Sequence, residues 1–348
     1  MEAERSVLIF GAGSVGGYLG GKLAAVKSWH VTLLGRRALV DAVTDRGLVV
    51  REQGVDVVSH PEARANLDAE TSYDLIMLTV RTYDVAGVTR ELETALGQSG
   101  LLLAMQNGVG TEETLAERLG RERVLAGTLT VRPGMDQPGV ITRYSQSGGV
   151  ALASMTDSPP PAWVVDAFRA TGLPTVVVAD YRSLRWSKLL LNMLGAATTA
   201  ILDIEVRELV SDPQLFRLEQ LAFREAGRVM DAQGIKTVAL PGYPVPLGRV
   251  VMRLPLPLAQ RLIGPRMSRA RGGHSPGMRA DLKRGRTEID SYNGEIARAA
   301  QALGVPAPVN TALTSLTLEL AQDPERREAF RGNTQEFLAY LGAHGVRL

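Results

Sequence analysis

The fold of this chain is decided by the stretch Val7-Leu8-Ile9-Phe10-Gly11-Ala12-Gly13-Ser14-Val15-Gly16-Gly17. An apolar strand runs into a Gly-x-Gly-x-x-Gly turn, and a helix is predicted to follow over Tyr18 to Val26. Such a turn places phosphates on the free N–H groups at the helix N-terminus, where the helix dipole favours negative charge. We therefore predict a dinucleotide site, with a plain tight turn as the alternative, at Gly11, Ala12, Gly13, Ser14, Val15 and Gly16.

Length and composition limit which classes of protein this chain can belong to. The chain has 348 residues and 45% hydrophobic content, enough for two domains with buried cores. The absence of cysteine excludes disulfides and thiolate chemistry and suits a cytoplasmic protein. The four scattered histidines argue against a metal site, and the net charge of +2 gives no argument for nucleic acid. We expect no signal peptide, because the first five positions include charged residues, and no membrane span, because the longest apolar run, Leu189 to Leu202, is too short.

The first half of the chain alternates short strands with helical stretches, which predicts an α/β fold with a parallel sheet covered on both faces. Two further strand pairs are predicted as hairpins, one joining 48–51 to 55–59 and the other joining 140–144 to 150–153. The strands of the sheet are predicted at 6–10, 31–34, 74–80, 101–105, 124–129 and 175–179.

The character of the sequence changes after about Asp180, where strand signals stop. Long helical segments are predicted over 184–202, 213–233, 278–303 and 311–320. We therefore predict a Rossmann domain over 1–180 and a mainly helical domain over 181–348. A segment over 240–276, rich in proline and arginine, interrupts the second domain. It could be a lid, a contact between the subunits of a homodimer, or a source of arginines for a carboxylate.

The end of the second strand bears on the kind of dinucleotide. An acidic residue there binds the ribose hydroxyls of NAD, but this chain reads Leu33-Leu34-Gly35-Arg36-Arg37. An arginine at this position suits a 2′-phosphate in charge and in geometry. We therefore predict NADP(H) with Arg36 as a contact; the alternative is that both arginines are solvated surface residues.

Lys188 is the first candidate for catalysis. Only five of the 39 basic residues are lysines, and this one lies at the start of a predicted helix, four residues before Asn192, so that both share one face. Unlike a guanidinium, an ammonium can give up a proton to the alkoxide that hydride transfer creates. The alternative is that the side chain only reaches past the apolar helix to water. Glu288, in Thr287-Glu288-Ile289-Asp290, could accept a hydrogen bond from substrate or ribose, or be an exposed helical glutamate.

Several motifs taken together resemble the ketopantoate reductase (2-dehydropantoate 2-reductase) family over nearly the whole chain. Each is weak alone, but their order is specific. They are the glycine turn at 11–16, Gln106-Asn107-Gly108-Val109-Gly110, Lys188-x-x-x-Asn192 with Thr199-Ala200-Ile201, Thr287 to Asp290 with Asn293-Gly294, and Gly304-Val305-Pro306-x-Pro308-x-Asn310.

The resemblance implies NADPH-dependent reduction of a small 2-oxo acid to a 2-hydroxy acid, as in pantothenate biosynthesis. It also implies an N-terminal Rossmann domain and a helical second domain like the C-terminal domain of 6-phosphogluconate dehydrogenase. Lys188 would be a general acid, and Glu288 would contact cofactor or substrate. Asn107 would contact the nicotinamide and substrate, Arg81 the cofactor, and Asn192 and Ser275 the substrate.

The chain departs from the family pattern at positions expected to hold the substrate. Ala196 and Val206 stand where family members commonly carry asparagine, Pro276 displaces the usual serine to Ser275, and Arg81 replaces a common lysine. These departures weaken the case for ketopantoate more than the case for reduction. Two alternatives remain: the same fold acting on another oxo acid or secondary alcohol, and an NADP-binding regulator without catalysis.

Overall fold

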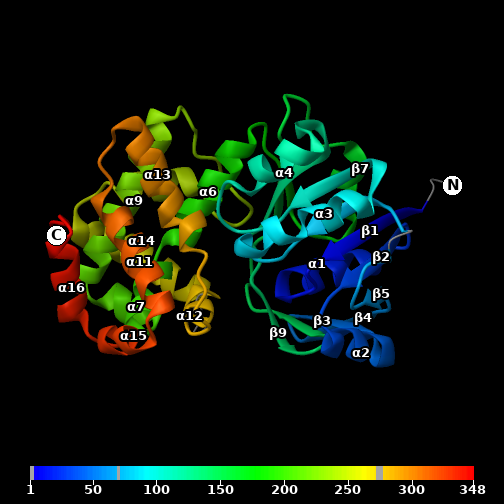
Figure 1. The fold of residues 1–348 in the computed structure, drawn as a ribbon, viewed down its shortest axis with the longest axis horizontal. Coiled ribbons are helices and arrows are strands. Elements are labelled where there is room, and N and C mark those ends of the chain that lie inside the picture. Colours follow the sequence, from blue (N-terminus) through cyan, green and yellow to red (C-terminus); the bar gives the residue numbers. More distant parts are fainter. Residues whose placement is uncertain (1–3, 69–70, 272–276) are drawn as a thin grey trace. The chain divides into compact units, whose positions relative to one another are not determined.

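The computed structural model describes residues 4–68, 71–271 and 277–348, which form two compact units (Figure 1). The first unit extends to Arg185 and includes Leu240–Tyr243, and the second holds Trp186–Ala239 and Pro244–Leu348. The division lies inside helix α6 (Tyr181–Met193), shortly after the predicted boundary at 180.

An eight-stranded sheet forms the centre of the first unit. Its order is β12-β11-β8-β7-β6-β1-β2-β5, and neighbours are parallel except for the antiparallel pair β8 and β11. The apolar residues of β1 and β8 are buried, as a sheet covered on both faces requires. The predicted α/β fold is confirmed. The strands are β1 (Arg5–Phe10), β2 (Trp29–Leu34), β5 (Glu62–Arg64), β6 (Tyr73–Leu78), β7 (Leu96–Ala104), β8 (Val124–Leu129), β11 (Val150–Ser154) and β12 (Thr175–Val177).

A second sheet of four strands has the order β4-β3-β10-β9. It is formed by β3 (Leu48–Glu52), β4 (Val55–Ser59), β9 (Pro133–Gln137) and β10 (Val140–Arg143). The hairpin predicted over 48–59 is confirmed, because β3 and β4 are antiparallel neighbours. The predicted pairing of 140–144 with 150–153 is wrong: β10 pairs with β9 and β3, whereas β11 pairs with β8 in the large sheet. Gly139, at φ +79°, turns the chain so that the partner of β10 precedes it.

Helix α1 (Ser14–Ala24) packs against strands of both sheets, which explains its high glycine content. A Cβ at Gly20 would lie 2.5 Å from a methyl of Leu33 on β2, and one at Gly21 would lie 2.5 Å from a methyl of Val50 on β3. Glycine therefore costs some helix propensity here but permits close packing on two sides. The other helices of the unit are α2 (Arg37–Arg46), α3 (Val85–Ala95), α4 (Thr111–Leu119), α5 (Ala162–Ala170) and the 3-10 turns η1 (Thr82–Asp84) and η2 (Arg121–Arg123).

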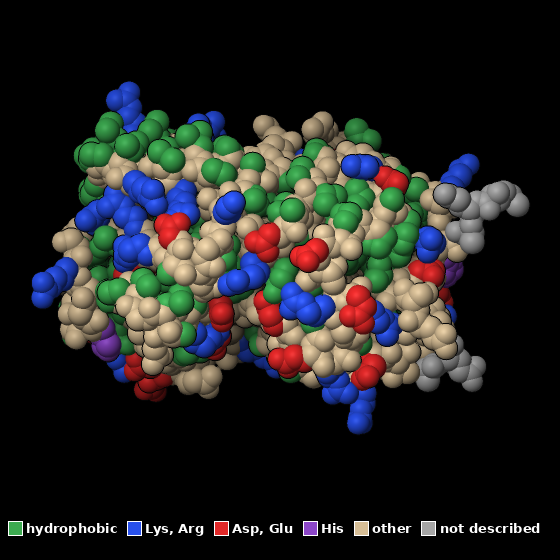
Figure 2. Space-filling model, turned by 90° about the horizontal axis from the view of Figure 1, so that it is seen from above, with side chains coloured by type: hydrophobic (Ala, Val, Ile, Leu, Met, Phe, Trp, Pro, Cys, Tyr) green, Lys and Arg blue, Asp and Glu red, His purple; other side chains and the backbone are tan. Residues whose placement is uncertain are grey.

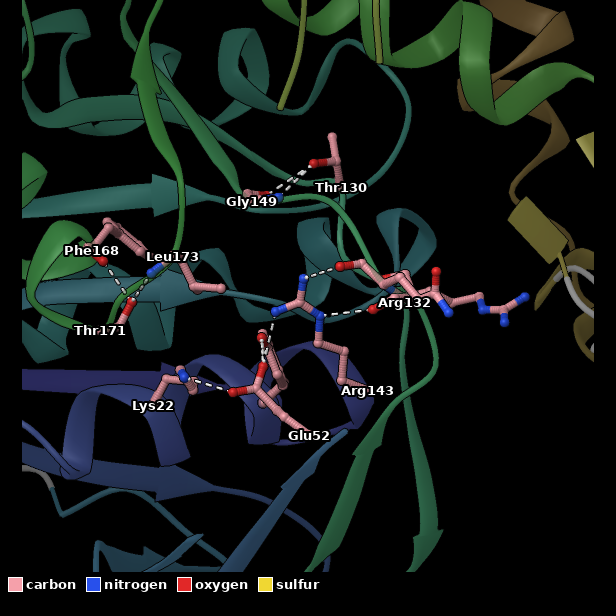
Figure 3. A network of polar contacts seen from close by, with 12 residues as sticks. Lys22, Glu52, Thr130, Arg132, Arg143, Gly149, Phe168, Thr171 and Leu173 are labelled. Atoms are coloured by element: carbon pink, nitrogen blue, oxygen red, sulfur yellow. Dashed lines mark hydrogen bonds and ion pairs between the residues drawn. The ribbon is translucent and has the colours of Figure 1, made fainter. Parts of the chain in front are cut away.

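A half-buried carboxylate ties α1 to the second sheet (Figure 3). Glu52 of β3 accepts hydrogen bonds from Lys22 Nζ at 2.8 Å, Tyr18 Oη at 2.6 Å and Arg143 Nη1 at 3.1 Å. Burial alone would raise the pKa of Glu52, but these hydrogen bonds outweigh it and lower that pKa to about 2. The helix that follows the glycine turn is thereby held in place by charge as well as by packing.

The second unit is helical, with α9 (Pro213–Ala232) packed against α8, α11, α13 and α14. The start predicted for α9 is confirmed: Asp212 Oδ1 accepts hydrogen bonds from the backbone N–H groups of Gln214 and Leu215, and Pro213 is the first helical residue. No helix within the described residues is long and apolar enough to cross a membrane. Besides α6, the remaining helices are α7 (Ala196–Leu202), α8 (Val206–Ser211), α10 (Val245–Val251), α11 (Leu256–Arg271), α12 (Gly277–Leu282), η3 (Ile289–Ser291), α13 (Asn293–Leu303), α14 (Pro308–Gln322), α15 (Pro324–Phe330) and α16 (Thr334–Ala343).

Two long helices predicted in this unit are each broken, so those predictions are wrong. The stretch 184–202 divides into α6 and α7 at Gly195, which has φ +72°. The stretch 278–303 divides into α12, η3 and α13, with Gly285 at φ +73° after α12. A left-handed glycine ends a helix without disturbing the hydrophobic period that the prediction used.

Candidate active site

Four neighbouring strands end at one edge of the large sheet and deliver most of the predicted cofactor residues there. In the registers of the parallel pairs, Phe10 lies opposite both Leu34 and Leu78, and Leu78 lies opposite Ala104. The glycine turn, Arg36, Arg81 and Asn107 follow these strand ends within a few residues. The carboxyl edge of a parallel sheet is where ligands of this fold bind.

The glycine turn has the geometry that the motif predicts. The N–H groups of Gly11 and Ala12 donate to Leu34 O, at 3.2 and 2.8 Å, so the turn is held to the end of β2. Gly11 has φ +101°, a conformation that favours glycine. A Cβ at Gly16 would lie 2.6 Å from Gly11 O and 2.5 Å from Thr79 Oγ1, so only glycine fits there without displacement.

Gly13, unlike the crowded Gly16, has open space beside it, and this space shows whether the turn has room for a dinucleotide. It is exposed, and a Cβ built on it would have no neighbour closer than Gly11 O at 3.9 Å. It is also the N-cap of α1, and within the described residues no side chain caps this helix and no acidic residue lies in its first turn. The first N–H groups of α1 and the space beside Gly13 therefore suit a pyrophosphate.

Arg36 lies at the N-cap of α2, two residues after the end of β2, and is exposed. It forms no ion pair with any residue in the described part of the chain, whereas its neighbour Arg37 is 3.2 Å from Asp41. Arg36 is therefore available to a phosphate. Arg81 is half-buried at the N-cap of η1, after Val80, whose methyl packs against Gly11.

The loop after β7 carries the predicted Asn107 and a residue that the sequence reasoning did not select. Gly108 and Gly110, both at positive φ, turn the chain into α4, and Asn107 is half-buried before them. Gln106 is 4% exposed, and neither Nε2 nor Oε1 has a hydrogen-bond partner among the described residues. An unpaired buried amide is costly, which suits a residue that awaits a ligand. The position of Gln106 directly before Asn107 in the Gln-Asn-Gly motif could have identified it as a candidate site residue.

A buried arginine fixes this loop. The Arg185 guanidinium, 2% exposed, donates to three carbonyl oxygens: Ala104 at 2.8 Å, Gln106 at 2.6 Å and Gly127 at 2.9 Å. It also pairs with Glu112 of α4; burial raises the pKa of that carboxyl, and the arginine opposes the rise. The end of β7 and the loop after it are thereby tied to β8. Sequence reasoning missed both residues because nothing local marks them as buried.

Helix α6 carries Lys188 and Asn192, both half-buried, among fully buried neighbours such as Leu189. Lys188 was predicted at the start of its helix, and this is wrong. Asp180 accepts hydrogen bonds from the N–H groups of Arg182 and Ser183, so α6 begins at Tyr181 and Lys188 lies in its middle. A half-buried lysine on an apolar helix packs its aliphatic stem against apolar neighbours.

Glu288 is 4% exposed and directly precedes η3, so it is neither helical nor on the surface. The Thr287 hydroxyl accepts a hydrogen bond from the Ile289 N–H at 3.1 Å and shapes this turn. The alternative of an exposed helical glutamate is therefore wrong. Ser275, the remaining predicted substrate residue, lies outside the described residues, as does Pro276. The described residues include no group of three or more His, Asp or Glu that could hold a metal ion.

Two asparagines of the recognised motifs are structural. Asn310 Nδ2 donates to Ala222 O at 3.0 Å and to Glu225 Oε2 at 2.7 Å, and its Oδ1 accepts from Asn293 Nδ2 at 3.0 Å. Both asparagines are almost fully buried, and burial raises the pKa of Glu225 against these hydrogen bonds. This network joins α9, α13 and α14.

Comparison with known proteins covers nearly the whole chain. The family model described as ketopantoate reductase PanE/ApbA matches residues 7–156, and the model of its C-terminal part matches residues 180–321. A 2-dehydropantoate 2-reductase of Halobacterium salinarum is 30% identical over 91% of this chain and 98% of its own length. One from Pyrococcus horikoshii is 27% identical over 89% of this chain and 95% of its own length.

Solved structures show the same fold. A PanE/ApbA family ketopantoate reductase from Ralstonia eutropha JMP134 superposes with a TM-score of 0.76 at 29% identity, over 93% of this chain and 99% of that one. A D-mandelate dehydrogenase solved with NADH and anilino(oxo)acetate gives a TM-score of 0.76 at 22% identity, over 91% of this chain and 98% of that one.

Proposed function

The chain belongs to the ketopantoate reductase family, and from this we propose that it reduces ketopantoate (2-dehydropantoate) to pantoate with NADPH. The observation that carries the proposal is the match of both parts of the chain, 7–156 and 180–321, to the two family models. The family is one of oxidoreductases, and the relatives named above are 2-dehydropantoate 2-reductases. Pantoate would then enter pantothenate biosynthesis, in a cytoplasmic setting that the lack of cysteine suits.

The preference for NADPH over NADH rests on Arg36. The tip of β2 offers no carboxylate to the ribose hydroxyls, and the exposed guanidinium can form a bidentate contact with a 2′-phosphate. The pyrophosphate would bind at the turn over 11–16, and the nicotinamide end would contact Asn107, with Gln106 supplying its unpaired amide. Arg81 would contact the cofactor as well.

The chemistry needs one proton for each hydride. When bound, the cofactor supplies a hydride to the carbonyl carbon of the 2-oxo acid. Lys188 Nζ donates a proton to the carbonyl oxygen, which gives the hydroxyl of the product and a neutral amine that solvent reprotonates. Asn192 lies one helical turn away on the same face and would hold the substrate by hydrogen bonds. Glu288 would contact substrate or ribose, and Ser275 would contact the substrate.

Steady-state kinetics of NADPH oxidation tests this function. We expect ketopantoate to give a kcat/KM at least about tenfold above those of 2-oxo acids with linear, branched or aromatic side chains, because one well-placed polar contact discriminates by that amount or more. NADH should be a poorer donor than NADPH.

A second candidate is a reductase of a different 2-oxo acid or a dehydrogenase of a secondary alcohol. It is favoured by Ala196 and Val206, which are buried apolar residues where the family commonly carries asparagine. A higher kcat/KM for another oxo acid, or turnover only with NADP⁺ and an alcohol, would establish it. Tight NADPH binding without turnover on any of these compounds would instead favour a regulator.

A further inference from the structure

A pocket lined by arginines lies in the second unit, and the proposed reaction does not use it. Helix α9 contributes Phe223, Arg224, Gly227 and Arg228, and Arg249 of α10 and the following Arg253 complete it. Its volume is about 230 Å³. Arg224 and Arg228 are four residues apart in α9 and so lie on one helical face, whereas Arg253 lies in the turn that follows α10. We call this site the arginine pocket.

Three of the four arginines donate to backbone carbonyls, and Arg228 does so from Nη2 to Pro306 O at 3.3 Å. Arg224 donates from Nε to Met252 O at 2.7 Å and from Nη2 to Leu254 O at 3.0 Å. Arg249 donates from Nη2 to Gly227 O at 2.7 Å and to Asp231, and its buried Nε has no partner among the described residues. A guanidinium has five N–H donors, so each keeps donors for a ligand.

Gly227 shapes the pocket. A Cβ at this position would lie 3.2 Å from Arg249 Nε, so the absence of a side chain lets this guanidinium lie against α9. The arginine fork is thus positioned before any ligand arrives, and little side-chain entropy remains to be lost on binding.

The positive charge in the pocket is poorly balanced. Within the described residues, Asp231 is the one carboxylate that forms ion pairs with the four arginines, and it is 56% exposed. The nearby Glu225 interacts with Arg228 through charge, but its hydrogen bonds go to the Val309 and Asn310 N–H groups. Burial, and then the positive charges of Arg217, Arg228 and Arg253, lower the pKa of Arg224. Figure 2 shows Lys and Arg side chains gathered on the part of the surface at its left, which belongs to the second unit.

We propose that the arginine pocket binds a phosphoryl group, either as inorganic phosphate or as the phosphate of a small phosphorylated compound. Several guanidinium groups with unused donors match the tetrahedral oxygens of a phosphate, and a dianion compensates more of the excess charge than a single carboxylate does. A metal cation would be repelled. This site is independent of the proposed reductase activity, since it uses none of the residues assigned to that reaction.

Isothermal titration calorimetry of the full-length protein with inorganic phosphate tests the proposal. Phosphate is titrated once without NADP⁺ and once with saturating NADP⁺, whose own phosphates fill the dinucleotide site. Chloride holds the ionic strength constant in both titrations. We expect one phosphate per chain. Binding that vanishes when NADP⁺ is added would place the ion at the dinucleotide site and overturn the proposal. Because turnover is not measured, a wrong substrate assignment leaves this test intact.

A pair of double variants separates a built site from general attraction. Arg228→Gln with Arg253→Gln removes two lining charges, and we expect phosphate to bind about tenfold more weakly or worse. Arg261→Gln with Arg266→Gln removes two exposed charges of α11 outside the lining and should change the affinity by less than about twofold. Equal weakening in both double variants would overturn the proposal.

Gly227→Ala tests the cradle without changing the charge. The added methyl should displace the Arg249 guanidinium and weaken phosphate binding by several-fold while α9 remains intact, since alanine favours helix. Unchanged affinity would overturn the role given to Arg249. Circular dichroism melting checks that each variant folds, and Arg253→Gln alone, at a side chain 64% exposed, replaces any double variant that does not.

The choice of probe distinguishes the source of the phosphate. Tighter binding of glycerol 3-phosphate than of inorganic phosphate would assign the pocket to a phosphorylated compound, and the reverse order would assign it to the free ion. Malonate binding more tightly than both would overturn the phosphoryl assignment.

Discussion

The glycine turn of the first unit and the middle of α6 in the second unit are built on different principles. At the turn, backbone N–H groups would form the proposed binding surface, and Gly13 and Gly16 matter because they carry no side chain. On α6, one side-chain atom, Lys188 Nζ, carries the proposed chemistry, and its neighbours only set its burial. A backbone site should therefore respond to steric changes, whereas the helix should respond to the loss of a single functional group.

The largest expected effect is at the functional group. Lys188→Ala should lower kcat by about 10²–10⁴-fold, the usual contribution of a general acid, while NADPH binding measured by fluorescence stays within a few-fold. Lys236→Ala, which removes an exposed lysine of the same unit, is the matched control and should leave kcat unchanged. A similar kcat in both variants would remove Lys188 from the mechanism.

Two glycine variants break the backbone site in different ways. Gly16→Ala places a methyl within 2.6 Å of Gly11 O, so we expect the free energy of unfolding to fall by about 1–3 kcal/mol. Gly13→Ala meets open space and should keep its stability but lose NADPH affinity, because the methyl occupies the approach of the pyrophosphate. Chemical denaturation and fluorescence titration measure the two effects. An equal loss of stability in both variants would contradict the different roles given to Gly13 and Gly16.

The anchor of α1 predicts a dependence on pH. The pKa of Glu52 is about 2 in the folded chain against 4.5 for an ordinary glutamate, so its carboxylate stabilises the fold above about pH 4.5. That contribution, on the order of 3 kcal/mol, should be lost as the pH falls from 4.5 towards 2. Denaturation of Glu52→Gln should show a shallower loss over this range, while Glu93→Gln, from an exposed ion pair, should follow the wild type.

The smallest expected effect concerns the choice of cofactor. Arg36→Gln should raise KM for NADPH by about tenfold, the value of one charged phosphate contact, and leave KM for NADH unchanged. Arg37→Gln is the control, because Arg37 pairs with Asp41 and should change neither constant by more than about twofold. An equal rise for both cofactors would assign Arg36 to general electrostatics.

Some features of the fold and of the candidate site could be predicted from the sequence and others could not, and the difference has a physical reason. The turn at 11–16, the hairpin over 48–59 and the start of α9 at Asp212-Pro213 depend on contacts between residues close in the chain, and each was predicted. The pairing of β10 with β3 and of β11 with β8 joins residues many positions apart, and it was missed. The burial of Glu288 and the unpaired amide of Gln106 depend in the same way on neighbours that composition does not reveal.

The amino-acid order was sufficient for the α/β class, the strand–glycine turn–helix unit and the family, because glycine spacing and hydrophobic period express backbone conformation directly. It could not place Lys188 in the middle of α6, set the close approaches of α1 to two sheets, or bring four arginines to one pocket. Those features arise from packing between distant segments. There, burial and uncompensated charge depend on which side chains the fold brings together.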